Sequence, residues 1–158
     1  MNLKIVCVGK LKEAYFEQAC AEFQKRLRRY ASLEIVEVPD EKAPESLHEK
    51  DETLVREKEG ARILKAIGEK DFVVALAIDG KQLSSEAFAA FLSEKALAAR
   101  PLTFVIGGSL GLSPAVYARA DTKLSFSQMT FPHRIARLML LEQLYRGFKI
   151  LHNETYHK

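Results

Sequence analysis

Two segments in the second half of the chain combine residue types and spacing that can do chemistry. The first, FVIGGSLGLSPAVY (residues 104–117), places Gly107, Gly108 and Gly111 directly after an apolar run. Glycines at the carboxyl end of a strand let backbone amides approach a ligand closely, and open α/β sheets bind ligands at that edge. Because neither G-x-x-x-x-G-K-[ST] nor G-x-G-x-x-G matches, the segment predicts a ligand site or a tight strand-to-helix turn, but no P-loop.

The second segment, SFSQMTFPHR (residues 125–134), leads into a predicted helix that starts near Pro132. The start of a helix offers unpaired backbone N–H groups to a ligand, and His133 and Arg134 add a titratable group and a cation beside them. A third segment, HNETYHK (residues 152–158), contains Tyr156 and His157, which can hydrogen-bond, stack and exchange protons. An exposed histidine in an ordinary loop and a disordered tail are the alternative interpretations of these segments.

Several other chemistries are excluded by the sequence. It contains no G-x-S-x-G, H-E-x-x-H or C-x-x-C motif. Cys7 falls within a predicted buried strand and Cys20 on the apolar face of a predicted helix. Two cysteines are also too few for a disulfide framework or for a zinc site, which needs about four ligands. We therefore expect neither a cysteine nucleophile nor a metal site.

Strand-like and helix-like segments alternate along the chain. Short apolar runs predict strands over residues 3–8, 33–38, 72–78, 102–106 and, more briefly, 124–126. Periodicity and capping signals predict helices over residues 16–30, up to Gly68, from Ser84 or Ser85, after Ser113-Pro114 and over 132–151. This order favours a single α/β domain over residues 1–158, with a mostly parallel sheet and helices on both faces.

Two local features complete this prediction. Asp79-Gly80 is expected to end the third strand, because these residues are typical of turns. The stretch 40–59 is dense in charge without being of low complexity, and we interpret it as the solvated face of a helix rather than as a linker.

The last predicted helix is apolar around well over half of its circumference. Its apolar residues are Ile135, Leu138, Met139, Leu140, Leu141, Leu144, Tyr145 and Phe148. A surface helix needs an apolar stripe only about 100° wide. We therefore expect this helix to pack on its own sheet on one side and on a second subunit on the other, forming a homodimer. Deep burial within one small domain is the alternative.

The charge of the chain is unevenly distributed. The net charge is +3, yet residues 1–79 carry 14 Lys/Arg against 16 Asp/Glu, and residues 80–158 carry 10 against 5. A basic second half suits an anionic partner, although it can also serve solubility alone. No segment approaches the roughly 18 apolar residues of a membrane span, and the first residues lack a secretory cleavage site. We therefore expect a cytoplasmic protein with no membrane partner.

Taken together, these motifs resemble the ribosomal RNA large subunit methyltransferase H family, the 23S rRNA (pseudouridine(1915)-N(3))-methyltransferases of the SPOUT class. The similarity covers essentially the whole chain and is carried by IVCVGKLK, FVVALAIDGKQLSSEAF, FVIGGSLGL, LSFSQMTFPHRIARLMLLEQLYR and HNETYHK. The part from the glycine turn to the last helix is the most specific, because it combines a glycine turn, a strand and an S-x-M-T-x-P-H-R loop in fixed order.

The resemblance implies an α/β knot, in which the C-terminal part of the chain threads through a loop to form a trefoil. Such knots are rare exceptions to the topology rules, so no periodicity argument predicts one. The resemblance also implies a homodimer through the last helix and S-adenosylmethionine as cofactor. The residues to which it assigns cofactor binding are Leu76, Gly108, Ser127, Gln128, Met129, Thr130, Phe131 and Pro132.

The implied activity is methyl transfer to N3 of a pseudouridine in 23S rRNA (position 1915) on the assembled ribosome. This imide nitrogen is mostly protonated at neutral pH, so transfer needs the proton removed or the resulting anion stabilised. Because of their chemical type and position, we expect His133, Tyr156 or His157 to remove this proton. Arg134 is expected to stabilise negative charge on the base or to hold a phosphate.

The implied partner is RNA, and no DNA partner is expected. The cations expected to hold RNA phosphates are Arg119, Lys123, Arg137, Arg146 and Lys149. Two alternatives stay open. One is a ribosome-associated RNA-binding factor without catalysis. The other is a Rossmann dehydrogenase or Rossmann-type methyltransferase, which should carry a glycine fingerprint directly after its first strand, where this chain has GKLK.

Overall fold

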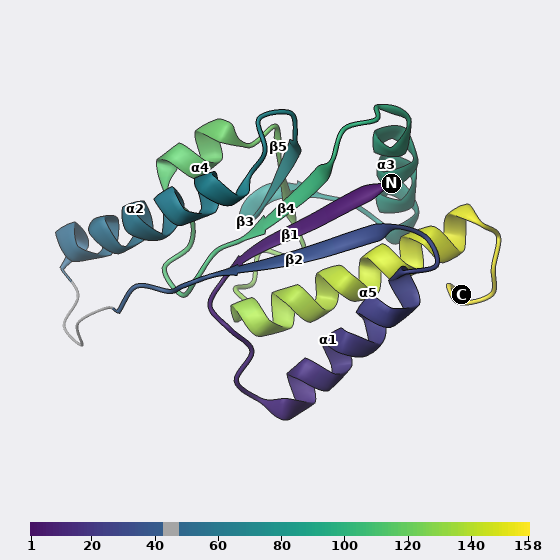
Figure 1. Ribbon diagram of the computed structural model, residues 1–158, viewed down its shortest axis with the longest axis horizontal. Coiled ribbons are helices and arrows are strands. Elements are labelled where there is room, and N and C mark those ends of the chain that lie inside the picture. The colour runs from purple at the N-terminus through teal and green to yellow at the C-terminus, as the bar shows by residue number, and fades with distance from the viewer. Residues whose placement is uncertain (43–47) are drawn as a thin grey trace.

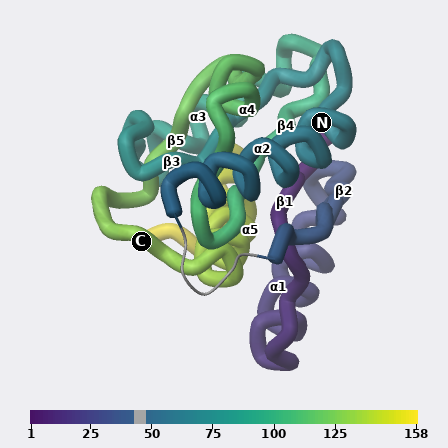
Figure 2. Tube along the Cα trace, turned by 90° about the vertical axis from the view of Figure 1, so that its left-hand side faces the viewer, coloured from purple at the N-terminus to yellow at the C-terminus, as the bar shows by residue number. Residues whose placement is uncertain are grey.

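The computed structural model describes residues 1–42 and 48–158, which form a five-stranded sheet with helices on both faces (Figure 1). The strands are β1 (Asn2–Val8), β2 (Ser32–Val38), β3 (Phe72–Gln82), β4 (Leu102–Ile106) and β5 (Thr122–Ser125). The helices are α1 (Ala14–Leu27), α2 (Glu49–Ala66), α3 (Ser85–Leu97), α4 (Pro114–Arg119) and α5 (His133–Leu151). The strand order is β2-β1-β4-β3-β5 and every neighbouring pair is parallel, so the predicted α/β class and parallel sheet are confirmed. Figure 2 shows β2 and β5 at opposite sides of the molecule.

Each face of the sheet has its own core, because successive side chains of a strand point to opposite faces. In β1, Leu3, Ile5 and Cys7 belong to a cluster shared with α1, α3 and α5. Val6 and Val8 belong to a second cluster shared with α2 and α4. Both helix layers are visible in Figure 1, with α1 and α5 below the sheet and α2 and α4 above it. Cys7 and Cys20 are buried free thiols in the first cluster, as predicted.

Two predicted helix starts are confirmed by their caps. The Ser84 hydroxyl accepts a hydrogen bond from Ala87 N at 3.0 Å, which identifies Ser84 rather than Ser85 as the N-cap of α3. The Ser113 hydroxyl accepts from Val116 N at 3.3 Å, and Pro114 occupies the first turn of α4. Each cap satisfies a backbone donor that has no partner within its own helix.

The prediction that Asp79-Gly80 ends the third strand is wrong. β3 continues to Gln82 through a shift in its pairing with β5, where Leu124 is the partner of both Leu76 and Lys81. Gly80 permits this, because a Cβ at that position would lie only 2.8–2.9 Å from backbone atoms of Leu124. The turn-forming residues therefore produce a bulge inside the strand instead of its end.

The interpretation of residues 40–59 as a solvated helix face is partly wrong. Residues 43–47 lie outside the described residues, and α2 begins at Glu49. Most charged side chains of α2 are exposed or half-buried, but Glu59 is only 4% exposed. Its neighbour Gly60 lets α2 approach α4, since a Cβ at Gly60 would collide with the Ser113 hydroxyl.

The long helix α5 packs on the sheet with one side only. Leu140, Leu141 and Leu144 are fully buried in the first core cluster. Ile135 and Met139, from the other side of the apolar circumference, are half-buried, and Leu138 is half-buried at the edge of the same cluster. The helix therefore keeps an apolar side that its own chain buries only in part, and the homodimer remains a prediction. Within the described residues, none of the helices has the length and apolarity to cross a membrane.

The prediction that Arg137 holds an RNA phosphate is wrong. Its side chain is buried, Nη1 pairs with Glu37 Oε2 at 2.8 Å and Nη2 donates to Gly9 O at 3.1 Å. Three more of the predicted phosphate ligands are engaged within the chain. These are Arg119 with Asp121 and backbone carbonyls, Arg146 with Glu142, and Lys149 with Glu154. Lys123 is the most exposed of the five, and its only ion pair among the described residues is with the exposed Asp79 at 3.4 Å.

Replacing Arg137 with Met tests how much this buried guanidinium stabilises the fold. We expect the free energy of unfolding to fall by about 2–4 kcal/mol, because the change leaves the Gly9 carbonyl unsatisfied and breaks a buried ion pair. Urea denaturation measures the loss. The matched control is Arg26→Met, which removes an exposed pair with Glu22 and should cost much less. Equal losses in the two variants would contradict the structural role given to Arg137.

Candidate functional site

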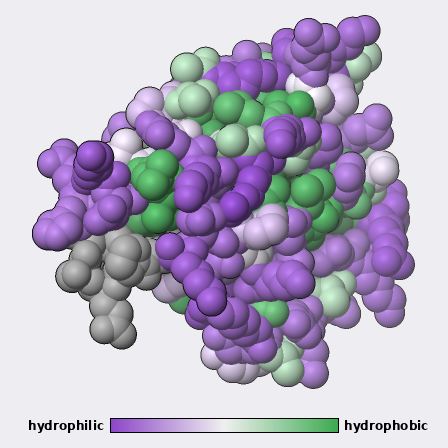
Figure 3. Space-filling view, turned by 60° about the vertical axis from the view of Figure 1, so that its left-hand side comes forward, coloured by the Kyte–Doolittle hydropathy of each residue, from purple (hydrophilic) through white to green (hydrophobic). Residues whose placement is uncertain are grey.

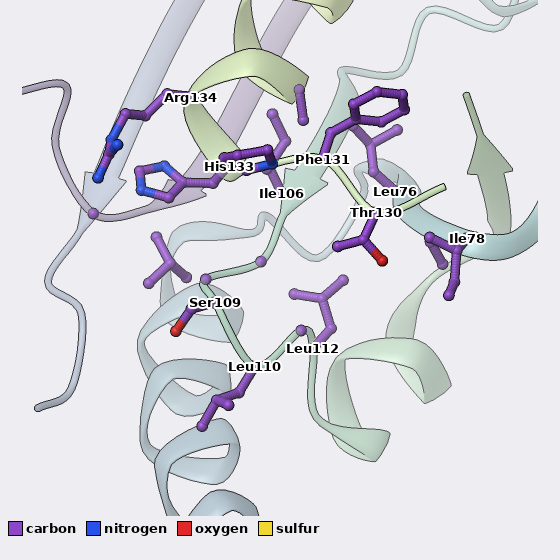
Figure 4. A pocket seen from close by; sticks show the side chains of 18 of the residues that line it. Leu76, Ile78, Ile106, Ser109, Leu110, Leu112, Thr130, Phe131, His133 and Arg134 are labelled. Carbon is purple, nitrogen blue, oxygen red and sulfur yellow. The ribbon is translucent and has the colours of Figure 1, made fainter. Parts of the chain in front are cut away.

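Segments at or near the carboxyl ends of four strands line one cavity of about 910 Å³ at the carboxyl edge of the sheet (Figure 4). β1 contributes Gly9, β3 the segment 76–78, β4 the segment 107–112 and β5 the segment 126–132. Carboxyl ends of parallel strands meet at one edge, so loops distant in sequence converge there. The two segments that the sequence singled out thus line the same cavity.

Most of the predicted site residues line this cavity. They are Leu76, Gly108, Ser127, Met129, Thr130, Phe131, Pro132, His133 and Arg134. Gln128 belongs to the same loop but is not part of the cavity wall. Tyr156 and His157 also lie elsewhere in the described chain, beside the later turns of α5.

The cavity wall has an apolar part and a polar part. Its apolar side chains are Leu76, Ile78, Ile106, Leu112, Tyr117, Leu124, Phe126 and Phe131. Its charged and titratable side chains are Lys10, Lys12, Asp40, Glu41, Glu59, His133 and Arg134. In Figure 4, Leu76 and Ile78 lie on one side of the cavity, and His133 and Arg134 lie on the other. The wider surface is mixed as well, with hydrophobic patches between hydrophilic side chains on the face shown in Figure 3. The cavity suits a ligand with one flat apolar end and one charged end.

The glycine turn after β4 brings bare backbone into the wall. Gly111 N donates to Gly108 O at 3.1 Å, and Gly111 has a φ of +82°, which side chains disfavour. A Cβ at Gly107 would lie 2.9 Å from Gly111 C, so the turn closes only without side chains. The glycines therefore form the tight turn that the sequence predicted as one interpretation, and their backbone lies in the cavity wall, while ligand binding stays a prediction.

The loop after β5 is held in place by hydroxyl groups. Ser125 Oγ lies 3.1 Å from Ile78 O and 2.9 Å from Ser127 O. Ser127 Oγ in turn accepts from Met129 N at 3.0 Å. These contacts fix the loop against β3, while the Met129 side chain itself is largely exposed.

His133 and Arg134 begin α5 and reach back to the turn after β1. A Cβ at Gly9 would lie 3.4 Å from His133 Cε1, so the imidazole covers this glycine closely. Arg134 Nη1 pairs with Glu13 Oε1 at 3.1 Å. Burial lowers the pKa of His133, and the guanidinium groups of Arg134 and Arg137 lower it further. His133 is therefore a neutral imidazole at pH 7, and its Nδ1 has no hydrogen-bond partner among the described residues.

Tyr156 and His157 are bound to α5 in the middle of its length. The Tyr156 hydroxyl donates to Glu142 Oε1 at 3.2 Å, and its ring packs edge-on against Tyr145. The His157 ring lies between Arg146 and Glu86, at 3.2 and 2.8 Å. Burial raises the pKa of Tyr156, and the Glu142 carboxylate raises it further. Glu142 follows His133 by nine positions, or about 14 Å along the helix, so one chain does not bring Tyr156 and His157 to His133 and Arg134.

Several polar residues that reach the cavity from the first half of the chain are not predictable from sequence motifs. Lys10 and Lys12 follow β1, Asp40 follows β2, and Glu59 comes from α2. No spacing motif connects them, because they meet only through the order of the strands. One signal was present for Glu59, since the adjacent Gly60 is a glycine inside a helix and indicates close packing. No group of three or more His, Cys, Asp or Glu side chains in the described ranges could hold a metal ion.

The lowered pKa of His133 has a measurable consequence for stability. Because the folded state binds this proton less tightly than the unfolded state does, the free energy of unfolding should decrease as the pH falls below about 6.5. His133→Gln removes this contribution, so the variant should lose less stability between pH 7.5 and 5.5 than the wild type. Urea denaturation at both pH values measures the difference, and titration of the His133 ring by NMR measures the pKa itself. A ring pKa at or above 6.5 would contradict the assignment.

Comparison with known proteins places the chain in a family. A family model described as "Predicted SPOUT methyltransferase" matches residues 1–157. The chain is 54% identical to "Ribosomal RNA large subunit methyltransferase H" of Limosilactobacillus fermentum and 52% identical to the proteins of that name from Clostridium beijerinckii and Enterococcus faecalis, with 100% of both chains covered each time.

A solved structure supports the fold. "The structure of a probable methylase family protein from Haemophilus influenzae Rd KW20" matches with a TM-score of 0.56 and 16% identity, over 99% of this chain and 70% of that one. The family model, the full-length relatives and the cavity built from the two characteristic loops agree with one another. The chain belongs to the SPOUT methyltransferases and, within them, to the ribosomal RNA large subunit methyltransferase H family.

Proposed function

We propose that this protein uses S-adenosylmethionine to methylate N3 of a pseudouridine in 23S rRNA, at position 1915, on the assembled ribosome. The observation that carries the proposal is the cavity in which the glycine turn and the segment 126–134 meet. Family membership and the name of the relatives support an rRNA substrate. Work on ribosomes would take place in the cytoplasm.

The residues of the cavity fit this cofactor. Leu76, Ile78 and Phe131 offer an apolar surface to an adenine ring, and the bare backbone at Gly108 permits close approach. The charged side chains on the opposite part of the wall suit an amino-acid end that carries both charges. When bound, the cofactor supplies a methyl group on a sulfonium, which is an activated electrophile. The protein must then align the two reactants and exclude water.

His133 is the residue we propose for the proton of the pseudouridine N3. A neutral imidazole can accept a proton at its unprotonated ring nitrogen, whereas an imidazolium cannot. Arg134, held by Glu13 at the rim of the same cavity, is in position to stabilise negative charge on the base.

Tyr156 and His157 join this site only if they come from a second subunit. In their own chain they contact α5 residues and lie apart from the cavity. We propose a homodimer formed through the half-buried side of α5, with Ile135, Leu138 and Met139 in the interface. Such a dimer would place the terminal segment of one chain near the cavity of the other.

Two further properties belong to the same proposal. One is the trefoil knot, which the family implies and which the return of the segment 126–132 to the glycine turn supports. The other is RNA binding by exposed cations. Lys10 and Lys12 at the cavity and Lys123 outside it are better suited to phosphates than the buried Arg137. A double-stranded region would be recognised mainly by shape.

Methyl transfer from labelled S-adenosylmethionine tests the proposal against the alternative of an RNA-binding factor without catalysis. The substrates are ribosomes that lack the modification and free large-subunit RNA. We expect label in the RNA of ribosomes alone, and a fall of about 100-fold or more for His133→Ala with cofactor binding retained. Absence of label on both substrates, despite cofactor binding by the wild type, would favour the non-catalytic alternative.

Mixed dimers test whether Tyr156 acts on the partner's cavity. His133→Ala and Tyr156→Phe homodimers are each expected to be nearly inactive. In a dimer with one variant of each kind, one cavity keeps an intact His133 and receives an intact Tyr156 from the other chain. Mixing and reassociating the two variants should therefore restore transfer that neither has alone. If each residue acts within its own chain, no intact site forms and activity stays absent.

A further inference from the structure

A buried carboxylate lies beneath the glycine turn of the cavity. Glu59 belongs to α2, lines the cavity and is 4% exposed. It approaches Gly108 so closely that a Cβ at that glycine would lie 3.1 Å from Glu59 Oε1 and 3.3 Å from Oε2. A Cβ at Gly108 would also lie 3.1 Å from Val8 Cγ1, at the end of β1. The absence of a side chain at Gly108 therefore gives the carboxylate access to whatever occupies the cavity.

One oxygen of this carboxylate has no protein partner. Oε2 accepts a hydrogen bond from Glu41 N at 3.0 Å, whereas Oε1 has no partner among the described residues. Burial raises the pKa of Glu59, and the nearby carboxylates of Asp40 and Glu41 raise it further, against the opposing effect of Arg62. A buried acceptor without a donor costs free energy, so the arrangement indicates a donor that is supplied by a ligand.

Close packing at the adjacent Gly60 positions Glu59 at the cavity. The adjacent Gly60 lies against Ser113 and Val116 of the segment that follows the glycine turn. Without a side chain at Gly60, α2 comes closer to the sheet edge than packing of ordinary side chains would allow. Gly60 therefore lets α2 pack closely against the start of α4, and this packing brings the Glu59 carboxylate to the cavity.

The composition of the wall identifies the donor. The apolar part, which includes Leu76 and Phe131, suits the adenine ring, and Glu59 belongs to the charged part. Lys10 and Lys12 in that part can pair with a ligand carboxylate, whereas Glu59 accepts from a donor, and a cationic donor gives the strongest hydrogen bond to a carboxylate. We propose that Glu59 binds the α-ammonium group of S-adenosylmethionine through Oε1; this inference rests on the proposed function of the cavity. Glu59 is then a cofactor-binding residue contributed by the N-terminal half of the chain.

Equilibrium binding measured by calorimetry tests this contact without any need for turnover. The ligands are S-adenosylmethionine, S-adenosylhomocysteine and 5′-methylthioadenosine, of which only the last lacks the amino-acid end. Glu59→Gln should weaken the first two by about 10- to 100-fold, because a charged hydrogen bond is lost, and leave the third unchanged. Glu57→Gln, the same change at an exposed position of the same helix, is the matched control and should leave all three unchanged.

The outcomes separate this inference from the proposed function. Equal affinity of wild type and Glu59→Gln for S-adenosylmethionine overturns the inference alone. An equal loss for all three ligands also overturns it, because it shows a structural effect or a contact to the ribose or adenine. A wild type that binds none of the three ligands overturns the proposed function of the cavity as well.

Folding of the variant is checked by urea denaturation. Glu59→Gln should be at least as stable as the wild type at pH 7, since it removes a buried carboxylate whose ionised form is costly. If it fails to fold, Glu59→Asp replaces it in the same comparison. The shorter side chain keeps the charge but withdraws Oε1, so it should weaken the two ligands that carry the amino-acid end and spare 5′-methylthioadenosine. Unchanged affinities of a folded Glu59→Asp for all three would overturn the inference.

Discussion

The buried guanidinium of Arg137 joins three segments on which the site depends. It is anchored in α5, pairs with Glu37 in β2 and donates to the carbonyl of Gly9 after β1. In a low-dielectric interior such contacts are strong and demand a fixed geometry. The start of α5 is thereby fixed against the turn after β1, which sets His133 over Gly9 and Arg134 beside Glu13. The position of the proposed catalytic imidazole follows from this one buried charge.

The parallel sheet supplies the second constraint. All five strands run in one direction, so the loops after β1, β4 and β5 meet the bulged part of β3 at one edge. Backbone segments can approach one another closely there only at positions without side chains. Gly107 and Gly111 close the turn after β4. Gly80 allows the bulge in β3, after which β3 continues to pair with β5. In the sequence these glycines resemble ordinary turn residues. In the structure they are positions where two backbone segments come into contact. Each glycine costs chain entropy on folding, but the absence of its side chain allows a ligand to approach the main chain.

The charged and titratable side chains of the cavity lie across from its apolar side chains. Burial keeps His133 neutral beside two guanidinium groups, and the same physical cause raises the pKa of Glu59 on the neighbouring wall. Both groups retain an atom without a protein partner, Nδ1 and Oε1. Unsatisfied buried atoms are rare in folded proteins and lower stability unless a ligand completes them. In the proposed function, His133 as the base and Glu59 as a ligand of the cationic cofactor would give both atoms a partner.

The sequence by itself determined the elements, the α/β class and the two loops that line the cavity, because hydrophobic period, caps and glycines are local signals. The β4 strand, the Ser84 and Ser113 caps and the start of α5 were predictable for this reason. Only the tertiary structure decided that Arg137 is buried, that β3 continues beyond Gly80 and that Glu59 lies at the cavity. A lone Arg or Glu in a charged segment gives the same sequence signal whether it faces water or a buried partner. Its environment is set by the strand order, which brings residues about 50 or 100 positions apart into contact, as Glu59 with Gly108 and Glu37 with Arg137.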